Sequence, residues 1–348
     1  MTVTVLSGGV GAARFLCGLL GVVAAAEVSA VINTGDDTEL HGLNISPDID
    51  TITYTLAGAI DPVRGWGLAG ETWVSMEALG RYAAVRPPGS TAAPTWFNLG
   101  DRDIATHFYR TARLREGSTL TEVTAEVARA WDLELAMLPM SDDRFRTVVT
   151  RADTGEELSF QDYFVRLSHG VPVAGVRFDH DHAQLTPAAR VALTDADVVV
   201  IAPSNPVVSI GPIRELADVN DLLAARRNSV VAVSPIVGGA ALKGPADRML
   251  AELGVESSVV GVAVLYAPIA GVLIIDPVDA HLASDVERTG MRCVVQPSVM
   301  TSQPIAESLA QACLDATSSD LHETIREGRP WRPRQVNPRS YRRHCEPL

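Results

Sequence analysis

Five short runs of apolar residues recur along this chain, and they lack the polar–apolar alternation of a half-exposed strand. They are Val3–Leu6, Val28–Ile32, Val198–Ile201, Ser229–Val233 and Val272–Ile275. Runs of this kind, rich in β-branched residues, are typical of strands buried on both faces of a parallel sheet. Helical stretches and turn residues separate them. The pattern therefore predicts an α/β fold, a three-layer Rossmann-like doubly wound and mostly parallel sheet.

The rest of the chain divides around this sheet. Residues 1–50 and 146–320 carry the strand runs, and we assign them to a Rossmann-like nucleotide-binding core. Residues 51–145 look mostly helical and are expected to form a helical insertion or lid stacked on that core. The tail, residues 321–348, is basic and proline-rich, and we expect it to be poorly ordered.

Composition excludes several classes of function. A net charge of −13 argues against a nucleic-acid surface, which needs clustered cations. No apolar stretch approaches the roughly 20 residues that span a bilayer. The N-terminus lacks the basic segment of a signal peptide, and the four cysteines follow no metal-binding spacing. We expect a globular cytoplasmic protein that binds neither nucleic acid nor membrane.

A glycine-rich turn follows the first run, where a strand of a parallel sheet leads into a helix. The segment Ser7-Gly8-Gly9-Val10-Gly11 lets backbone amides approach a phosphate at a helix N-terminus. It is not a P-loop, because no GK[ST] follows, and Arg14 stands where the last glycine of GxGxxG would be. A tight turn without a ligand is the structural alternative. An NAD site also stays open on these residues alone.

Carboxylates gather after the second run. Asp36, Asp37, Asp48 and Asp50 lie in a long stretch that contains no lysine or arginine. Mg²⁺ takes one or two carboxylates together with substrate phosphates, which suits this arrangement. Asp48 has a structural alternative as the cap of a helix that begins near Thr51. For Asp36 and Asp50 we favour contact with a metal or a substrate.

Two further strand runs end in loops that could bind a nucleotide. The loop after the third run offers Ser204, Asn205, Ser209 and Gly211. The loop after the fourth run begins at Ser234 and leads to Lys243, the single lysine of the chain. Ligands of a doubly wound sheet gather at the carboxyl ends of its strands, so these loops are expected to meet the glycine turn. Purely structural proline-rich turns are the alternative.

A polar helix start lies inside the predicted insertion. Asp101 can be its N-cap, and Asp103 and His107 share a face because they are four residues apart. A solvated pair is one interpretation. The other is a polar wall that faces a ligand, with Arg102 and Arg110 as partners for phosphate or carboxylate.

Together these motifs resemble the 2-phospho-L-lactate transferase family. The matching segments run in family order from residue 3 to about residue 315. They include Ser7–Gly11, Asn33–Asp37, Ile45–Thr51, Arg64–Gly67, Leu99–Asp103, Leu138–Asp143, Ala202–Pro212 and Ser234–Gly238. The ten residues Ala-Pro-Ser-Asn-Pro-Val-Val-Ser-Ile-Gly that begin at Ala202 are a highly specific match.

The resemblance implies an activity that composition could not show. The family transfers a phosphoenolpyruvyl or 2-phospho-L-lactyl group from its guanosine-diphosphate-activated form to the ribityl terminal hydroxyl of the deazaflavin Fo. This reaction belongs to coenzyme F420 biosynthesis; GMP leaves, and Mg²⁺ assists. The sequence is similar to the actinobacterial type, in which phosphoenolpyruvate supplies the acid. The resemblance also implies a homodimer.

The resemblance also implies roles for individual residues. Asp36 and Asp50 are expected to be catalytic and, with Asp37, to hold the metal. Fo is expected to contact Asp50, Asn98, Asp101, Arg102 and His107. The nucleotide and its phosphates are expected to contact Ser7, Gly8, Gly9, Gly11, Ser204, Asn205, Ser209, Gly211, Ser234 and Lys243.

Two other classes of function stay open at this point. One is an NAD-dependent oxidoreductase of Rossmann type, motivated by the glycine turn and the acids that follow it. The other is a non-catalytic nucleotide-binding or regulatory protein. The presence of both Asp36 and Asp50 argues against the second class.

Overall fold

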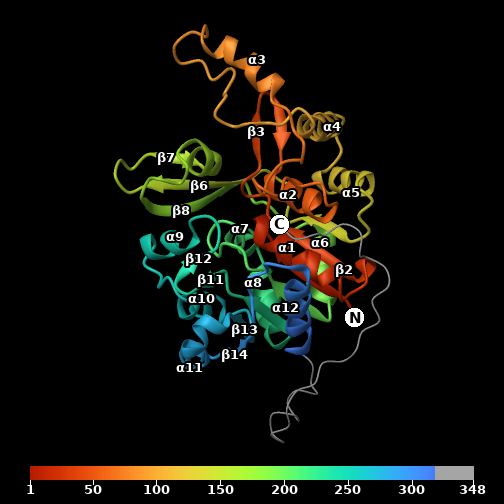
Figure 1. The fold of residues 1–348 in the computed structure, drawn as a ribbon, viewed down its shortest axis with the longest axis vertical. Coiled ribbons are helices and arrows are strands. Elements are labelled where there is room, and N and C mark those ends of the chain that lie inside the picture. Colours follow the sequence, from red (N-terminus) through yellow and green to blue (C-terminus); the bar gives the residue numbers. More distant parts are fainter. Residues whose placement is uncertain (318–348) are drawn as a thin grey trace, which may run out of the picture.

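A seven-stranded, entirely parallel sheet forms the middle layer of the protein (Figure 1). The computed structural model describes residues 1–317, so the predicted tail, 321–348, lies outside the described residues. The strand order is β14-β13-β10-β9-β1-β2-β5. The strands are β1 (Val3–Ser7), β2 (Val28–Ile32), β5 (Ala136–Pro139), β9 (Val198–Ile201), β10 (Val230–Val233), β13 (Val272–Ile275) and β14 (Arg292–Val295).

The five predicted runs are confirmed as the five central strands, but the two edge strands were not predicted. β5 is an apolar run without a β-branched residue, β14 begins with Arg292, and both strands are only partly buried. β5 lies inside residues 51–145, the stretch assigned to the helical insertion, yet it pairs with β2 in the central sheet. Residues 136–139 therefore belong to the core, and the insertion ends earlier than expected.

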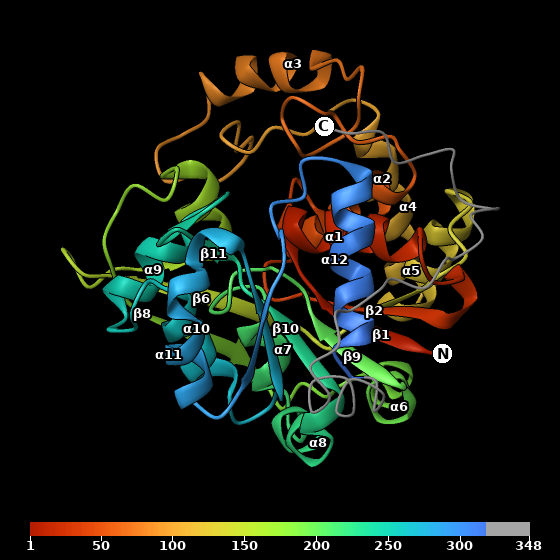
Figure 2. The same cartoon turned by 60° about the horizontal axis from the view of Figure 1, so that its bottom comes forward.

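Helices cover both faces of the sheet, because successive strand residues point to opposite layers. Val198 and Val200 pack with one helical layer, whereas Val199 and Ile201 pack with the other (Figure 2). The first layer comprises α1 (Gly9–Leu20), α2 (Pro47–Leu56), α5 (Leu120–Ala130) and α12 (Gln303–Asp315). The second comprises α6 (Pro187–Asp195), α7 (Gly211–Glu215), α8 (Val219–Ala225), α9 (Ala246–Glu252), α10 (Val259–Tyr266) and α11 (Ala283–Arg288). The predicted three-layer architecture is confirmed.

Smaller elements decorate this core. A separate antiparallel sheet has the order β7-β6-β8 and packs on α9 through Met249. Its strands are β6 (Phe145–Arg151), β7 (Glu157–Ser159) and β8 (Val173–His180). Two hairpins pair β3 (Thr38–Leu40) with β4 (Leu43–Ile45), and β11 (Ile236–Val237) with β12 (Ala240–Ala241). Short helical segments of the 3₁₀ type are η1 (Ala25–Glu27), η3 (Arg227–Ser229) and η4 (Pro277–Leu282), and η2 (Asp162–Arg166) is a short π-helix.

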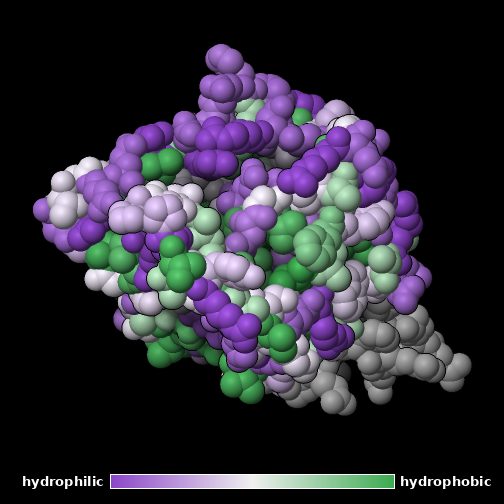
Figure 3. Space-filling model, turned by 90° about the horizontal axis from the view of Figure 1, so that it is seen from above, coloured by the Kyte–Doolittle hydropathy of each residue, from purple (hydrophilic) through white to green (hydrophobic). Residues whose placement is uncertain are grey.

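The insertion rises from the sheet edge at which β1 and β2 end. Its two helices are α3 (Val74–Ala83) and α4 (Asp103–Arg115). α4 lies nearer the core, and α3 lies farthest from it, above the β3–β4 hairpin (Figure 1). A small apolar cluster of Met76, Leu99 and Ile45 attaches α3 to that hairpin. Hydrophilic and hydrophobic side chains intermingle on the face seen from this end (Figure 3). Across residues 1–317, no helix is both long and apolar enough to cross a membrane.

Asp101 does not cap its own helix, contrary to the prediction. Its carboxylate accepts hydrogen bonds from the amides of Val74 (2.9 Å) and Ser75 (3.0 Å) at the start of α3. Glu71, just before α3, accepts instead from the amides of Arg102 and Asp103 at the start of α4, each at 2.9 Å. The two helix starts are thus capped by each other's flanking loops, which fixes α3 to α4.

Candidate functional site

Asn33 joins the loops that follow β1 and β2. Its backbone amide donates to Ser7 O (2.9 Å), the last residue of β1. Its side-chain amide donates to Asp36 Oδ1 (3.1 Å) and to Asp48 Oδ2 (2.9 Å). One buried amide group therefore holds two carboxylates side by side, one from the loop after β2 and one from the first turn of α2 (Pro47–Leu56).

Asp48 binds the start of α1, not the start of its own helix. Asp48 Oδ1 accepts from the amide of Gly9 (2.8 Å), although α2 begins at Pro47 and Asp48 lies in its first turn. The alternative prediction, that Asp48 caps a helix beginning near Thr51, is therefore wrong. Asp48 accepts a hydrogen bond at the start of α1 instead. A carboxylate is stabilised there by the amides and the dipole of α1.

The glycine turn is shaped by this contact and by its neighbours. Gly9 has φ = +68°, which favours glycine. A Cβ at Gly8 would lie 2.7 Å from Ser209 Cβ and 2.9 Å from Asp48 Oδ2. At Gly11 it would lie 2.1 Å from Pro203 O. The glycines therefore allow three loops to meet closely.

Asp36, Asp37, Asp48 and Asp50, hereafter the acidic cluster, lie in a poorly solvated place. Burial, and then repulsion from Asp48 and Asp37, raises the pKa of Asp36 well above its ordinary value. Burial likewise raises the pKa of Asp37, although a hydrogen bond from Ser46 opposes the rise. Burial raises the pKa of Asp48 to about 6, against the hydrogen bonds from Asn33 and Gly9. Ionising these groups together is costly unless a cation joins them.

Asp50 has a cationic partner within the protein. Arg110, from α4, contacts both oxygens of Asp50, with Nη1 3.1 Å from Oδ2 and Nη2 against Oδ1. Both residues are buried. Burial is the largest single influence and lowers the pKa of Arg110, but the charge and hydrogen bond of Asp50, with the charges of Asp37 and Tyr54, together outweigh it and the pKa rises. Asp50 is thus oriented and neutralised by a guanidinium.

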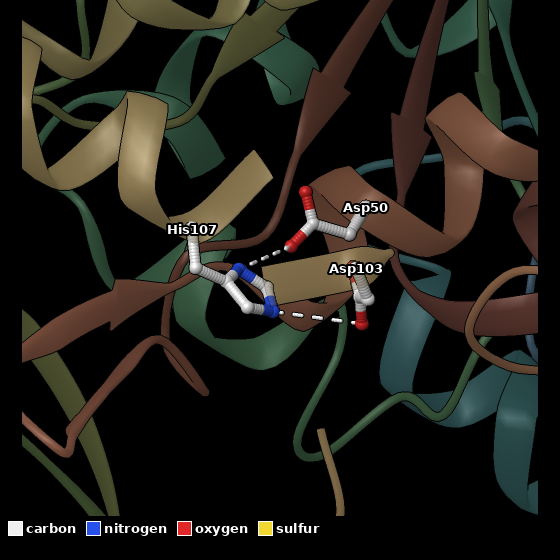
Figure 4. A group of neighbouring side chains, drawn as sticks. All are labelled: Asp50, Asp103 and His107. Carbon is white, nitrogen blue, oxygen red and sulfur yellow. Dashed lines mark ion pairs between the residues drawn. The ribbon is translucent and has the colours of Figure 1, made fainter. Parts of the chain in front are cut away.

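His107 lies between Asp50 and Asp103 (Figure 4). Its Nδ1 is 3.7 Å from Asp50 Oδ2, and its Nε2 is 3.5 Å from Asp103 Oδ2. The hydroxyl of Tyr54 donates to Asp103 Oδ1 (2.6 Å). His107 is 1 % exposed, so the solvated-pair interpretation is wrong and the polar wall is buried. One ligand atom from each of Asp50, Asp103 and His107 lies within 4.8 Å of the others, close enough to share a metal ion.

Several buried polar atoms around this site have no hydrogen-bond partner within the described part of the chain. They are Thr34 Oγ1, Asp37 Oδ1, His107 Nε2 and Thr147 Oγ1. Buried polar atoms are normally satisfied, so each needs an explanation. The unpaired oxygen Asp37 Oδ1 lies among carboxylates that have no cationic partner at this site. A hard divalent cation such as Mg²⁺ prefers carboxylate oxygen ligands, so it would suit this place. The remaining hydroxyls and the imidazole fit a polar ligand.

Of the predicted nucleotide contacts that are not glycines, Ser7, Ser204, Asn205 and Ser234 use their side chains to hold the loops. The hydroxyls of Ser7, Ser204 and Ser234 donate to backbone oxygens of Val5, Gly8 and Ile236. Asn205 Oδ1 accepts from the amide of Val207 (2.9 Å), and Gly211 begins α7. Among these residues, Ser209 keeps a hydroxyl near Gly8 that makes no hydrogen bond within residues 1–317. A phosphate here would meet this hydroxyl and backbone amides.

The predicted Fo contacts separate into two groups. Asp50 and His107 lie in the buried site. Asn98 is exposed, and Asp101 caps α3. The guanidinium of Arg102 donates to Ala69 O at 2.6 Å. The structure thus brings two of the five residues together, and it uses Asp101 and Arg102 to support the insertion.

Tyr54 and Asn33 are functional candidates that the sequence did not single out. Arg110 was considered only as a partner for a ligand, whereas the structure makes it a partner of Asp50. A signal was present for Arg110, because a residue three positions after His107 lies on the same helix face. Tyr54 had no signal, since its contact with Asp103 depends on how α2 packs against α4.

Residues 3–301 match the sequence profile of the family described as 2-phospho-L-lactate transferase CofD. A phosphoenolpyruvate transferase from Kitasatospora aureofaciens is 40% identical over 334 residues, covering 94% of this chain and 100% of the relative. One from Streptomyces avermitilis is 41% identical over 320 residues, covering 90% and 97%. One from Mycolicibacterium smegmatis is 39% identical over 335 residues, covering 92% and 100%.

Solved structures agree on the fold. A UPF0052 family protein from Bacillus halodurans superposes with a TM-score of 0.55 at 13% sequence identity. That match covers 90% of this chain and 98% of the other. At this level of identity the likeness concerns architecture alone.

Proposed function

Because the chain belongs to the 2-phospho-L-lactate transferase CofD family, we propose that it carries out the family's reaction on the deazaflavin Fo in coenzyme F420 biosynthesis. The donor is a three-carbon acid activated as its guanosine diphosphate derivative. The acceptor is the ribityl terminal hydroxyl of Fo. The relatives named phosphoenolpyruvate transferase favour phosphoenolpyruvate over 2-phospho-L-lactate as the acid.

The acidic cluster is the observation that carries this proposal. Its three uncompensated members, Asp36, Asp37 and Asp48, suit a hard divalent cation, and we propose that they hold Mg²⁺. Asp50 was expected to be a ligand as well, and its pairing with Arg110 favours a different role. When bound, the cation would offset negative charge on the diphosphate.

The residues of the chain position the acceptor. In the transfer, the ribityl oxygen forms a bond to the phosphorus that bears the three-carbon acid, and the bond from that phosphorus to the GMP oxygen breaks. The hydroxyl proton passes to a carboxylate. Asp50, held in place by Arg110 and flanked by His107, can accept the hydroxyl's hydrogen bond and orient it. Since a carboxylate is a weak base for an alcohol, orientation contributes more than proton removal.

The NAD-dependent alternative is not favoured. In that class the amides of the glycine turn receive the dinucleotide pyrophosphate. Here the amide of Gly9 is taken by Asp48, and the family that residues 3–301 match is a transferase family. A non-catalytic nucleotide-binding role would not explain why several carboxylates are buried together, where ionising them is unfavourable.

The test is to incubate the protein with Fo, Mg²⁺ and each guanosine-diphosphate-activated acid, and to measure the mass of the product. We expect the mass of Fo plus one phosphoryl-linked three-carbon acid, with release of GMP. Asp36→Asn should abolish product formation, whereas Asp181→Asn, on an exposed loop outside the acidic cluster, should not. Absence of product from both donors would refute the proposal.

A further inference from the structure

Two cations from segments distant in sequence approach each other beside the site. Arg14 lies on α1, and Lys243 lies between β12 and α9. The positive charge of Arg14 is near enough to lower the pKa of Lys243, after the larger effect of partial burial. A Cβ at Gly65 would lie 2.8 Å from Lys243 Nζ, so the ammonium group also touches the backbone of the insertion.

Within residues 1–317, the side chains of Arg14 and Lys243 have no acidic partner and make no hydrogen bond or ion pair. Elsewhere in this acidic protein, arginines commonly find carboxylates, as Arg113 does with Glu126 and Arg177 with Glu157. Two unpaired cations that repel each other raise the energy of the free protein. An anionic ligand would remove that cost.

The two cations lie on segments that follow the carboxyl ends of the central strands, as the acidic cluster does. α1 begins at the carboxyl end of β1, where Gly9 contacts Asp48, and Arg14 follows within two turns. Side chains on a helix lean toward its N-terminus, which brings the guanidinium toward the glycine turn. The Lys243 loop follows Ser234, at the carboxyl end of β10.

We propose that Arg14 and Lys243 form an anion subsite for the diphosphate of the activated donor, an inference that rests on the proposed function. A guanidinium can bind two phosphate oxygens at once, and an ammonium acts as a point charge. Negative charge grows on the GMP oxygen as its bond to the transferred phosphorus breaks. Cations placed there stabilise the departing nucleotide. Because Lys243 Nζ lies close to Gly65, this subsite is also next to the backbone of the insertion.

Calorimetric titration of the full chain tests this subsite, with GDP and inorganic pyrophosphate as probes and Mg²⁺ present. Arg14→Gln and Lys243→Met each remove one charge at similar side-chain length. We expect each to weaken binding of both probes about tenfold. Arg14→Lys should retain part of the affinity. Arg129→Gln, which removes an exposed arginine on α5, is the matched control and should change nothing. The dependence on salt should also fall in the double variant.

Outcomes separate this inference from the transferase proposal. Unchanged affinity for GDP and pyrophosphate in both variants overturns the subsite, as does a wild-type protein that binds neither probe. Weakened binding of the full donor alone, with GDP unaffected, also overturns it, because the cations would then contact the three-carbon acid. Probe binding that depends on both cations in a protein that forms no product with Fo keeps the subsite and refutes the transferase. Circular dichroism of each variant checks its fold.

Discussion

Arg110 and Asp50 form a two-point ion pair in the interior, with side-chain exposures of 1% and 7%. Arg110 comes from the insertion and Asp50 from the first turn of α2, so the pair joins the insertion to the core. Breaking a buried pair by removing one partner costs about 3–5 kcal/mol, because the other charge is left unpaired. The pair therefore has structural consequences that are separate from any role in the reaction.

Asp50→Asn should lower the free energy of unfolding by about 3–5 kcal/mol, because it leaves the guanidinium of Arg110 buried and unpaired. Arg110→Met should also destabilise, by leaving Asp50 unpaired. The double variant should recover much of the loss, which urea unfolding can measure as a double-mutant cycle. Glu157→Gln, which breaks an exposed pair with Arg177, should have little effect. Additive losses in the double variant would contradict the prediction.

Asp36→Asn should raise thermal stability at neutral pH without Mg²⁺, by a few degrees. Burial and two neighbouring carboxylates disfavour the charged form of Asp36, and the amide removes that charge. Its oxygen can still accept from Asn33. The same change should lower turnover by at least about 100-fold, if Asp36 holds the cation that stabilises transition-state charge.

Differential scanning calorimetry with and without Mg²⁺ checks the stability half of this prediction. The wild-type protein should gain stability from Mg²⁺, and Asp36→Asn should gain much less. Asp181→Asn should respond to Mg²⁺ as the wild type does. A variant that is both less stable and equally responsive to Mg²⁺ would show that Asp36 is a structural residue.

The central sheet was predictable, because strands buried on both faces must be apolar throughout. Val198–Ile201 is such a run, and every residue of it is buried. The edge strand Ala136–Pro139 has one exposed residue, few β-branched side chains and a final proline, so its sequence carries no strand signal. Pairing with β2 decides its structure.

The site was predictable in part, for a similar reason. Asp36 and Asp37 follow the carboxyl end of β2, where the topology of a parallel sheet gathers ligand-binding loops, whereas Asp50 lies in the first turn of α2 after the β3–β4 hairpin. The partners of those acids were not predictable. Arg110 reaches Asp50, and Asp48 reaches Gly9, through packing between elements that lie 60 and 39 residues apart in sequence. Local patterns do not encode such contacts.

Asp48 should make stability fall as pH rises between about 4 and about 6. Its pKa is about 6 in the folded protein, above the ordinary value of 3.8, so the folded state binds more protons in this window. Stability is then greatest below the unfolded pKa and is lost as pH rises through the folded pKa. A shift of this size corresponds to about 3 kcal/mol.

The difference between wild type and Asp48→Asn isolates this effect from the other ionisable groups. Urea unfolding at pH 4.5 and pH 7 should show the wild type losing stability relative to the variant. Mg²⁺ should oppose the loss at pH 7 more than at pH 4.5, because it binds the charged form. A constant difference between the two proteins across this range would contradict the assignment.

The crossed caps of α3 and α4 predict a crossed pattern of hydrogen exchange. Asp101→Ala should speed exchange of the Val74 and Ser75 amides at the start of α3, because its carboxylate accepts their hydrogen bonds. Glu71→Ala should instead speed exchange of the Arg102 and Asp103 amides at the start of α4. Glu77→Gln, on an exposed position of α3, is the control. Mass-spectrometric or NMR exchange can resolve the two helix starts. Faster exchange at the start of α4 in Asp101→Ala, with α3 unchanged, would show that Asp101 caps its own helix after all.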